Sequence, residues 1–228
     1  MLLALAVAVT RPLAGQQRKW EVAIGGVAMP SGRAIDFEGH RHMATGTGVG
    51  AEFLAGRGRI SLWGRAVATD FAAQTETATF GAQTETATMA VATIGDIDVR
   101  GRLRVGYFSL EGGIVRRVVT GQFAAQTWQG LRFGGRLHLR AGEGAFYFEG
   151  AAGYSPTLRS SGADATGKGM DFESALRFAP PRAPLWLSLG YRLERRDLPG
   201  LTGTQFERIS GIVVAGGLSL HGGSRPQQ

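Results

Sequence analysis

Histidines and carboxylates gather in one short stretch, Asp36 to His42, which reads DFEGHRH. His40 and His42 are two positions apart, so an extended chain would place both side chains on the same side. Imidazole and carboxylate groups are ligands for divalent metals. His40 and His42 are therefore candidates for a metal site. The alternative is that they are ordinary solvated loop residues, and no other cofactor is expected.

Hydrolysis is a second chemistry that these residues could serve. The candidates at loop mouths are Asp36, His40, His42, Asp70 and Asp197. Hydrolysis needs a base, a carboxylate that orients it and a positioned water within hydrogen-bond reach. No local motif demands that arrangement, and the chain has no phosphate-binding glycine loop, nucleophile elbow or zinc signature. The sequence therefore predicts no catalytic residue and no enzyme, with a loop-borne hydrolase kept as an alternative.

The most informative pattern lies between Asp96 and Gly106 and reads DIDVRGRLRVG. Its even positions from 96 to 104 are all charged, and its odd positions are apolar or glycine. A strand sends successive side chains to opposite faces, whereas a helix would scatter these charges around its circumference. The stretch is therefore predicted to be a strand with one charged face and one apolar face.

The same two-faced pattern recurs along the chain and predicts ten strands. They are expected at about 20–28, 43–54, 59–70, 89–105, 107–119, 128–140, 145–154, 169–179, 185–194 and 206–220. Polar connections are expected between them, the longest being 30–42, 71–88, 155–168 and 195–205. The predicted fold is all-β, a closed antiparallel up-and-down transmembrane β-barrel; eight or twelve strands would result if a hairpin is wrongly divided.

Which face looks inward is decided by further observations. Connections alternate between short and long, as in membrane barrels with short periplasmic turns and longer outer loops. An arginine on the lipid face would cost about 2–4 kcal/mol near the bilayer midplane, so the arginines are expected inside. Aromatic residues lie near strand ends and suggest two interfacial girdles, with Trp20, Phe53, Tyr107, Phe108, Phe146, Phe178 and Trp186 near the short turns and Phe71, Phe123, Trp128, Tyr154 and Phe206 near the long loops.

The charged face is expected to form a packed ion-pair network, because small barrels have little room inside. His138 is expected to join it as a satisfied member. The network is predicted to contain Asp96, Asp98, Arg100, Arg102, Arg104, Glu111, Arg117, Arg132, Arg136, Arg140, Glu149, Glu173 and Arg192. The same inward face is expected to carry Glu52, Arg59, Arg65, Asp171, Arg177 and Glu194.

Composition agrees with one exported β domain. The chain has 228 residues, 36 glycines, no cysteine and a formal net charge of +7. Its basic residues are spread among acids over many segments, which argues against nucleic-acid binding. Residues 1–15 are predicted to be a signal peptide, 16–221 the barrel and 222–228 a disordered tail. The duplicated AQTETAT at 73–79 and 82–88 is interpreted as slippage in a tolerant loop.

From about Trp20 to Leu220 the chain resembles the small bacterial outer-membrane β-barrel proteins. The resemblance rests on the alternation, the loop asymmetry and the signal-like start, and it identifies no subfamily. It implies a cell outer-membrane location, contact with outer-membrane lipid and insertion by the barrel-assembly machinery. The last strand ends Leu218-Ser219-Leu220-His221, whereas most members end with an aromatic residue that this machinery reads.

The expected function is a structural protein or a narrow anion-preferring pore with an arginine-rich lumen, acting as a monomer. Alternation alone also fits a barrel of the opposite orientation. The alternative is therefore a soluble, exported, lipocalin-like barrel that binds a small apolar ligand.

Overall fold

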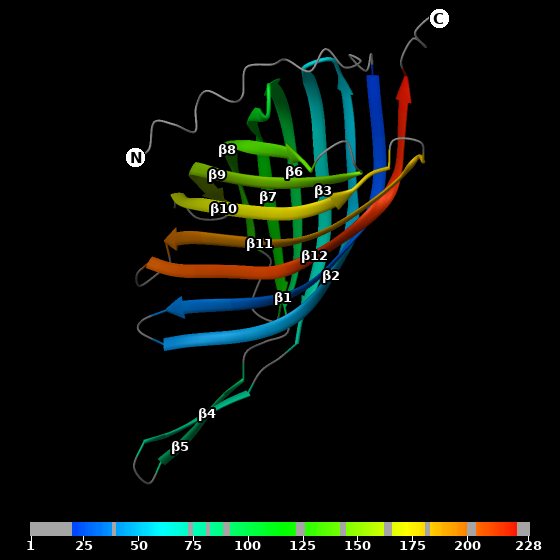
Figure 1. The fold of residues 1–228 in the computed structure, drawn as a ribbon. Coiled ribbons are helices and arrows are strands. Elements are labelled where there is room, and N and C mark those ends of the chain that lie inside the picture. Colours follow the sequence, from blue (N-terminus) through cyan, green and yellow to red (C-terminus); the bar gives the residue numbers. More distant parts are fainter. Residues whose placement is uncertain are drawn as a thin grey trace, which may run out of the picture.

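The computed structural model describes residues 20–37, 40–72, 75–80, 83–88, 92–121, 126–141, 145–161, 166–180, 183–199 and 204–222. These residues form a closed antiparallel barrel and a separate two-stranded hairpin (Figure 1). The predicted signal peptide lies outside the described residues. So does the predicted tail beyond Gly222, the last residue of the final strand. The described part of the chain contains no helix long and apolar enough to cross a membrane.

The barrel has the predicted ten strands. Their bonded order is β1-β12-β11-β10-β9-β8-β7-β6-β3-β2, and β1 pairs with β2 to close the ring. The up-and-down topology is therefore confirmed. The strands are β1 (Trp20–Phe37), β2 (His40–Arg57), β3 (Ile60–Phe71), β6 (Ala92–Val105), β7 (Phe108–Gly121), β8 (Gln126–Arg140), β9 (Phe146–Ser160), β10 (Thr166–Phe178), β11 (Leu185–Pro199) and β12 (Thr204–Gly222).

Side chains alternate between the two faces of the wall as the sequence predicts. Large apolar side chains point away from the barrel, with Ile60 68% and Leu187 61% exposed. Arginines of the other parity point inward, and Arg117 is only 1% exposed. This is the reverse of a soluble barrel, which keeps its hydrocarbon inside, so the lipocalin-like alternative has the wrong orientation. A wall with this exterior is suited to lipid, and closure pairs every strand edge.

Strands extend well beyond the predicted apolar segments at the end of the long connections. Within the stretch from Pro30 to His42, predicted as a polar loop, residues 30–37 and 40–42 are β-structure, in which Pro30 lies opposite Thr47 and Ser31 opposite Gly211. The predicted loops 155–168 and 195–205 are likewise largely strand. Antiparallel pairing satisfies the backbone hydrogen-bonding groups whatever the side chains are, so a strand can continue where its side chains are polar. These extensions lack the alternation of apolar and charged residues from which the strands were predicted.

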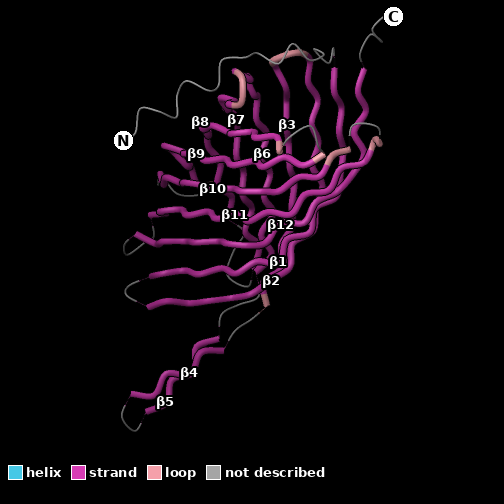
Figure 2. The backbone as a smooth tube through the Cα atoms, in the orientation of Figure 1, coloured by secondary structure: helices cyan, strands magenta, loops and turns pink. Residues whose placement is uncertain are grey.

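The duplicated segment, predicted to be a loop, forms a β-hairpin instead. Strands β4 (Thr75–Phe80) and β5 (Gln83–Thr88) pair antiparallel with Phe80 opposite Gln83. The hairpin projects away from the barrel wall, as the tube in Figure 2 shows. Alternating threonines explain the strand, since β-branched residues favour extended backbone.

Two short turns require glycine. Gly58 joins β2 to β3 and Gly106 joins β6 to β7, with φ angles of 63° and 65°. A two-residue turn that matches the twist of a hairpin needs positive φ at its first central residue, where glycine carries no steric penalty.

The aromatic residues form one clear outward girdle. It lies at the short-turn end and contains Trp20, Phe53, Tyr107, Phe108, Phe146 and Phe178, all exposed on the outer face. At the other end Tyr154 and Phe206 are exposed, and Phe123 lies outside the described residues. Three members of the predicted girdles are wrong: Phe71, Trp128 and Trp186 are buried in the lumen.

Candidate functional site in the barrel lumen

The lumen is lined by charges that come from consecutive inward positions of facing strands. On β6 the inward residues Asp98 and Arg100 are 4% and 2% exposed. On the neighbouring β7 the inward residues Glu111 and Arg117 are equally enclosed, and each is the centre of an ion-pair cluster. Alternation fixes this placement, because every second residue of a closed wall must point to the axis.

Four guanidinium groups surround the carboxylate of Glu111, whose side chain is fully buried. Its oxygens lie 3.0 Å from Arg100 Nη1, 2.8 Å from Arg102 Nε, 3.1 Å from Arg132 Nη1 and 2.8 Å from Arg136 Nε. We call these five residues the Glu111 cluster. It is drawn together from three adjacent strands, β6, β7 and β8.

Arg117 has the opposite arrangement, one cation among three acids. Its Nε lies 2.7 Å from Asp96 Oδ1, its Nη2 2.8 Å from Glu194 Oε2 and its Nη1 2.7 Å from Glu207 Oε2. These four residues are the Arg117 cluster. Glu194 and Glu207 come from β11 and β12, so this arginine bridges the barrel instead of pairing only with a neighbouring strand.

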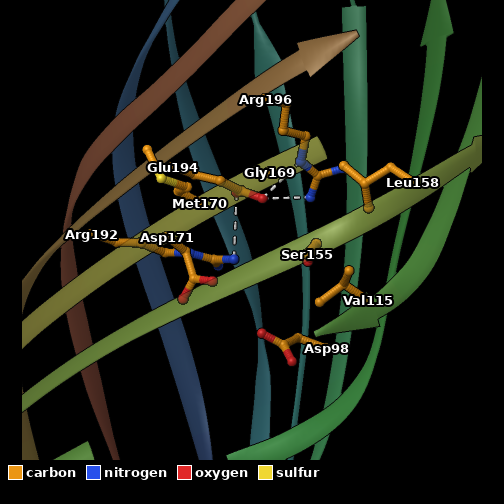
Figure 3. A pocket seen from close by; sticks show the side chains of 10 residues that line it. All are labelled: Asp98, Val115, Ser155, Leu158, Gly169, Met170, Asp171, Arg192, Glu194 and Arg196. Carbon is orange, nitrogen blue, oxygen red and sulfur yellow. Dashed lines mark hydrogen bonds and ion pairs between the residues drawn. The ribbon is translucent and has the colours of Figure 1, made fainter. Parts of the chain in front are cut away.

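Two further carboxylates, Asp98 and Asp171, extend the Glu111 cluster toward the Arg117 cluster. Asp171 is bound through both oxygens by Arg132, at 2.7 Å and 2.6 Å, and Asp98 forms a close ion pair with Arg100. Figure 3 shows the small void that Asp98 and Asp171 line together with Glu194, which contacts Arg192 and Arg196. Each buried charge therefore has partners of opposite sign, which offset its desolvation.

Trp63 packs inside this network as a flat apolar partner for cations. The guanidinium carbons of Arg100 and Arg102 each lie 4.7 Å from its ring centre, and that of Arg65 lies 4.9 Å away. At the short-turn end, Arg177 stacks over Trp186 at 4.5 Å. The charged face therefore includes aromatic surface, which arginine covers better than lysine would.

Little free space remains between these side chains. Two voids between the described side chains are small: one of about 30 Å³ borders Trp63, Arg102 and Arg136, and another of about 10 Å³ lies beside Asp98 and Glu194. Voids of this size hold one or a few waters. The side chains therefore fill the lumen, as expected of a narrow barrel.

Most of the predicted network residues come together in the lumen. Asp96, Asp98, Arg100, Arg102, Glu111, Arg117, Arg132, Arg136, Glu149, Glu173 and Arg192 all take part in ion pairs there. His138 joins as expected, with its Nδ1 3.3 Å from Glu149 Oε1. Arg59, Arg104 and Arg140, also expected inside, are exposed at the short-turn end, where Arg104 donates to the Gly106 carbonyl and Arg140 stacks on Tyr147.

Three members of the network were missing from the prediction: Arg33, Arg196 and Glu207. Arg33 pairs with Glu207 at 2.7 Å, and the side chain of Arg196 is only 5% exposed. Arg33 and Arg196 lie in stretches predicted as loops. One signal could have found Arg196. Arg192 and Glu194 are alternate residues predicted on the inner face, and continuing that alternation by two residues places Arg196 there as well.

The rim residues considered for metal binding or hydrolysis do not form a site among the described residues. The side chains of Asp36, His40 and His42 lie outside the description. Asp70 faces outward and accepts a hydrogen bond from Thr93 Oγ1 at 2.6 Å. Asp197 contacts Arg195 on β11, and β2, β1 and β12 separate this strand from β3 with Asp70. The described residues contain no group of three or more acids and histidines able to hold a metal ion.

Comparisons with known proteins reveal similarity of architecture only. No family model and no curated protein matches the sequence. Among solved structures, the outer membrane protease OmpT from Escherichia coli has a TM-score of 0.48 and 11% identity, over 89% of this chain and 96% of that one. The Pseudomonas putida toluene transporter TodX has a TM-score of 0.32 and 8% identity, over 91% of each chain. Outer-membrane expressed OmpT of Vibrio cholerae gives 0.39 and 8%, over 78% of this chain and 61% of that one.

Similarities this distant assign no activity and no substrate. The closed antiparallel wall with hydrocarbon outside and charge inside is itself the architecture of bacterial outer-membrane β-barrels. The chain has the fold of a barrel of this type.

Proposed function

We propose that this protein spans the outer membrane as a closed-lumen barrel with a structural role, holding the strand extensions and the β4–β5 hairpin above the bilayer. The observation that carries the proposal is the filled lumen. Glu111 and Arg117 each engage three or more oppositely charged partners within 3.1 Å, and the two small voids beside them hold a few waters at most. A monomer is part of the proposal, because closure leaves no barrel edge to pair with a second copy.

A narrow anion-preferring pore is the competing role. It would need a continuous path past the Glu111 cluster, where guanidinium and carboxylate groups are in direct contact. Acids line the lumen almost as densely as arginines, so the charge excess on which an anion preference depends is small. Both features support the closed barrel over the pore.

Planar-bilayer recording of the refolded protein tests the proposal. Insertion is checked first, by co-flotation with phosphatidylcholine vesicles and by the gel-mobility change of a folded barrel on heating. We expect inserted protein to show no steady conductance in a millimolar chloride gradient. Reproducible unitary steps with a reversal potential that reports anion preference would overturn the closed barrel in favour of the pore.

A further inference from the structure

A group of cations lies on the outer face of the barrel, where the apolar belt ends. Arg195 on β11 and Arg208 on β12 are exposed and point away from the lumen. Along these strands the last strongly exposed apolar side chains before them are Tyr191 and Ile212. The two arginines therefore stand just above the hydrocarbon region, at the depth of lipid headgroups.

The pairing of these two arginines is unfavourable by itself. Arg195 lies directly opposite Arg208 in the β11–β12 register. Residues in such positions have Cβ atoms about 4.5–5.5 Å apart, and like charges there destabilise a sheet. Two guanidinium groups held this close on an exposed face could both reach one anion, which would remove the repulsion between them.

Nearby acids neutralise only part of this charge. Asp197 lies 3.2 Å from Arg195 Nε and 3.9 Å from Lys168 Nζ on β10. Arg208 has no carboxylate partner among the described residues. Among the described side chains, Lys168, Arg195 and Arg208 against Asp197 therefore leave a net positive patch on three adjacent strands, which we call the rim patch.

We propose that the rim patch binds the phosphate of a lipid headgroup in the leaflet at this end of the barrel. The inference rests on the membrane placement proposed above. Guanidinium forks match phosphate oxygens bidentately, and cations near a membrane surface attract anionic lipid. The guanidinium of Arg195 stacks over Phe206 at 5.2 Å, which fixes the fork at the level of the headgroups.

A lipid fits the surroundings better than free phosphate does. Met170 lies opposite Arg195 in the β10–β11 register and is 55% exposed, and Ile212 on β12 is 52% exposed. Along its own strand, each lies on the membrane side of a cation, Met170 two residues from Lys168 and Ile212 four residues from Arg208, where acyl chains would cover it. A free phosphate would use only the charges, in competition with water and salt.

Native mass spectrometry of the purified barrel in neutral detergent tests this site. The probes are dioleoyl phosphatidic acid and dioleoyl phosphatidylcholine, which share acyl chains and differ in their headgroups. We expect the unmodified protein to retain phosphatidic acid preferentially. Loss of two interfacial cations in Arg195→Gln/Arg208→Gln should reduce that preference roughly 30-fold.

A matched control carries the same charge change at the opposite rim. Arg57 and Arg59 are exposed beside the Gly58 turn, so Arg57→Gln/Arg59→Gln should keep the full preference. The proposal is overturned if both double variants lose the preference equally, or if neither does. It is also overturned if millimolar inorganic phosphate displaces phosphatidic acid completely, since the site would then take free phosphate.

Flotation separates failure of this inference from failure of the proposed function. All three proteins are expected to float with pure phosphatidylcholine vesicles. If the unmodified protein does not, the membrane barrel itself is refuted. If it floats but shows no preference for phosphatidic acid, only the rim patch is refuted.

Discussion

Strand β7 carries two buried charge centres of opposite sign on one face. Glu111 is an acid among four arginines, and Arg117 is an arginine among three acids. They are roughly 20 Å apart along the strand, given about 3.3 Å per residue. The same wall therefore satisfies a buried anion at one depth and a buried cation at another.

The two clusters differ in what happens when the centre is removed. Carboxylates left without their cation can take up protons and become neutral, whereas arginine stays charged at any pH that a folded protein survives. The partners also differ. Within the described network Arg102 has Glu111 as its carboxylate, while Glu207 and Glu194 keep Arg33, Arg192 and Arg196 when Arg117 is lost. The Glu111 cluster should therefore be the more fragile of the two.

The largest effect is expected for Glu111→Gln, which removes one charge and keeps the side-chain shape. Four guanidinium groups would then face an amide that accepts from few of them and offers its own donors. We expect a loss of about 5 kcal/mol in the free energy of unfolding, at the upper end for a broken buried pair. Urea titration in lipid vesicles, followed by tryptophan fluorescence, measures it.

The control for this variant is Asp70→Asn, the same chemical change on an exposed outward acid. It should cost less than about 1 kcal/mol. Raising the pH to 9 should not restore Glu111→Gln. Equal stability of the two variants would show that Glu111 is not a charge centre.

A smaller effect is expected for Arg117→Met, which leaves three acids with their secondary partners. At neutral pH we expect a loss of about 3 kcal/mol. Stability relative to the unmodified protein should recover between pH 7 and pH 5, because protonation relieves the repulsion between Asp96, Glu194 and Glu207. Unfolding titrations at both pH values measure the difference.

Arg116→Met is the matched control, since Arg116 is adjacent in sequence but exposed on the outer face. Its stability should change by less than about 0.5 kcal/mol and show no recovery in acid. If Arg117→Met and Glu111→Gln respond identically to pH, the contrast between the clusters is wrong.

The sequence predicts one of these clusters better than the other. Arg100, Arg102 and Glu111 lie on neighbouring strands with clear alternation, so their meeting follows from strand order and parity. The Arg117 cluster depends on the closed ring. Two of its three acids, Glu194 and Glu207, come from β11 and β12, and their reach across the lumen is set by barrel width and register, which no local pattern encodes.

Polar strand extensions explain the other failures. Arg33 and Arg196 lie where the outer face no longer meets lipid, so the apolar half of the pattern disappears while backbone pairing continues. Trp186 is different, because its parity placed it on the charged face from the start. It was assigned to a girdle only because it lies near a strand end. That signal is weaker than the alternation of inward and outward positions along the strand.

The smallest effect concerns how tightly the Glu111 cluster is packed. Gly153 on β9 lies opposite Gly134 and Asp171, and the Arg132 guanidinium crosses directly over it to reach Asp171. A Cβ at Gly153 would overlap that guanidinium. Gly153→Ala should displace Arg132 and cost about 1–3 kcal/mol, as overpacking does, measured by the same urea titration.

Two further variants sharpen this last test. Gly26→Ala adds the same methyl group on the outer face, where nothing lies within 4 Å, and should be close to neutral. In the background of Arg132→Ala the clash is gone, so adding Gly153→Ala should cost little more. That coupling assigns the loss to the displaced guanidinium, because independent sites would simply add. Additive losses would show that the cost of Gly153→Ala comes from backbone strain and not from displacement of Arg132. The Glu111 cluster would then be packed less tightly than its four short contacts imply.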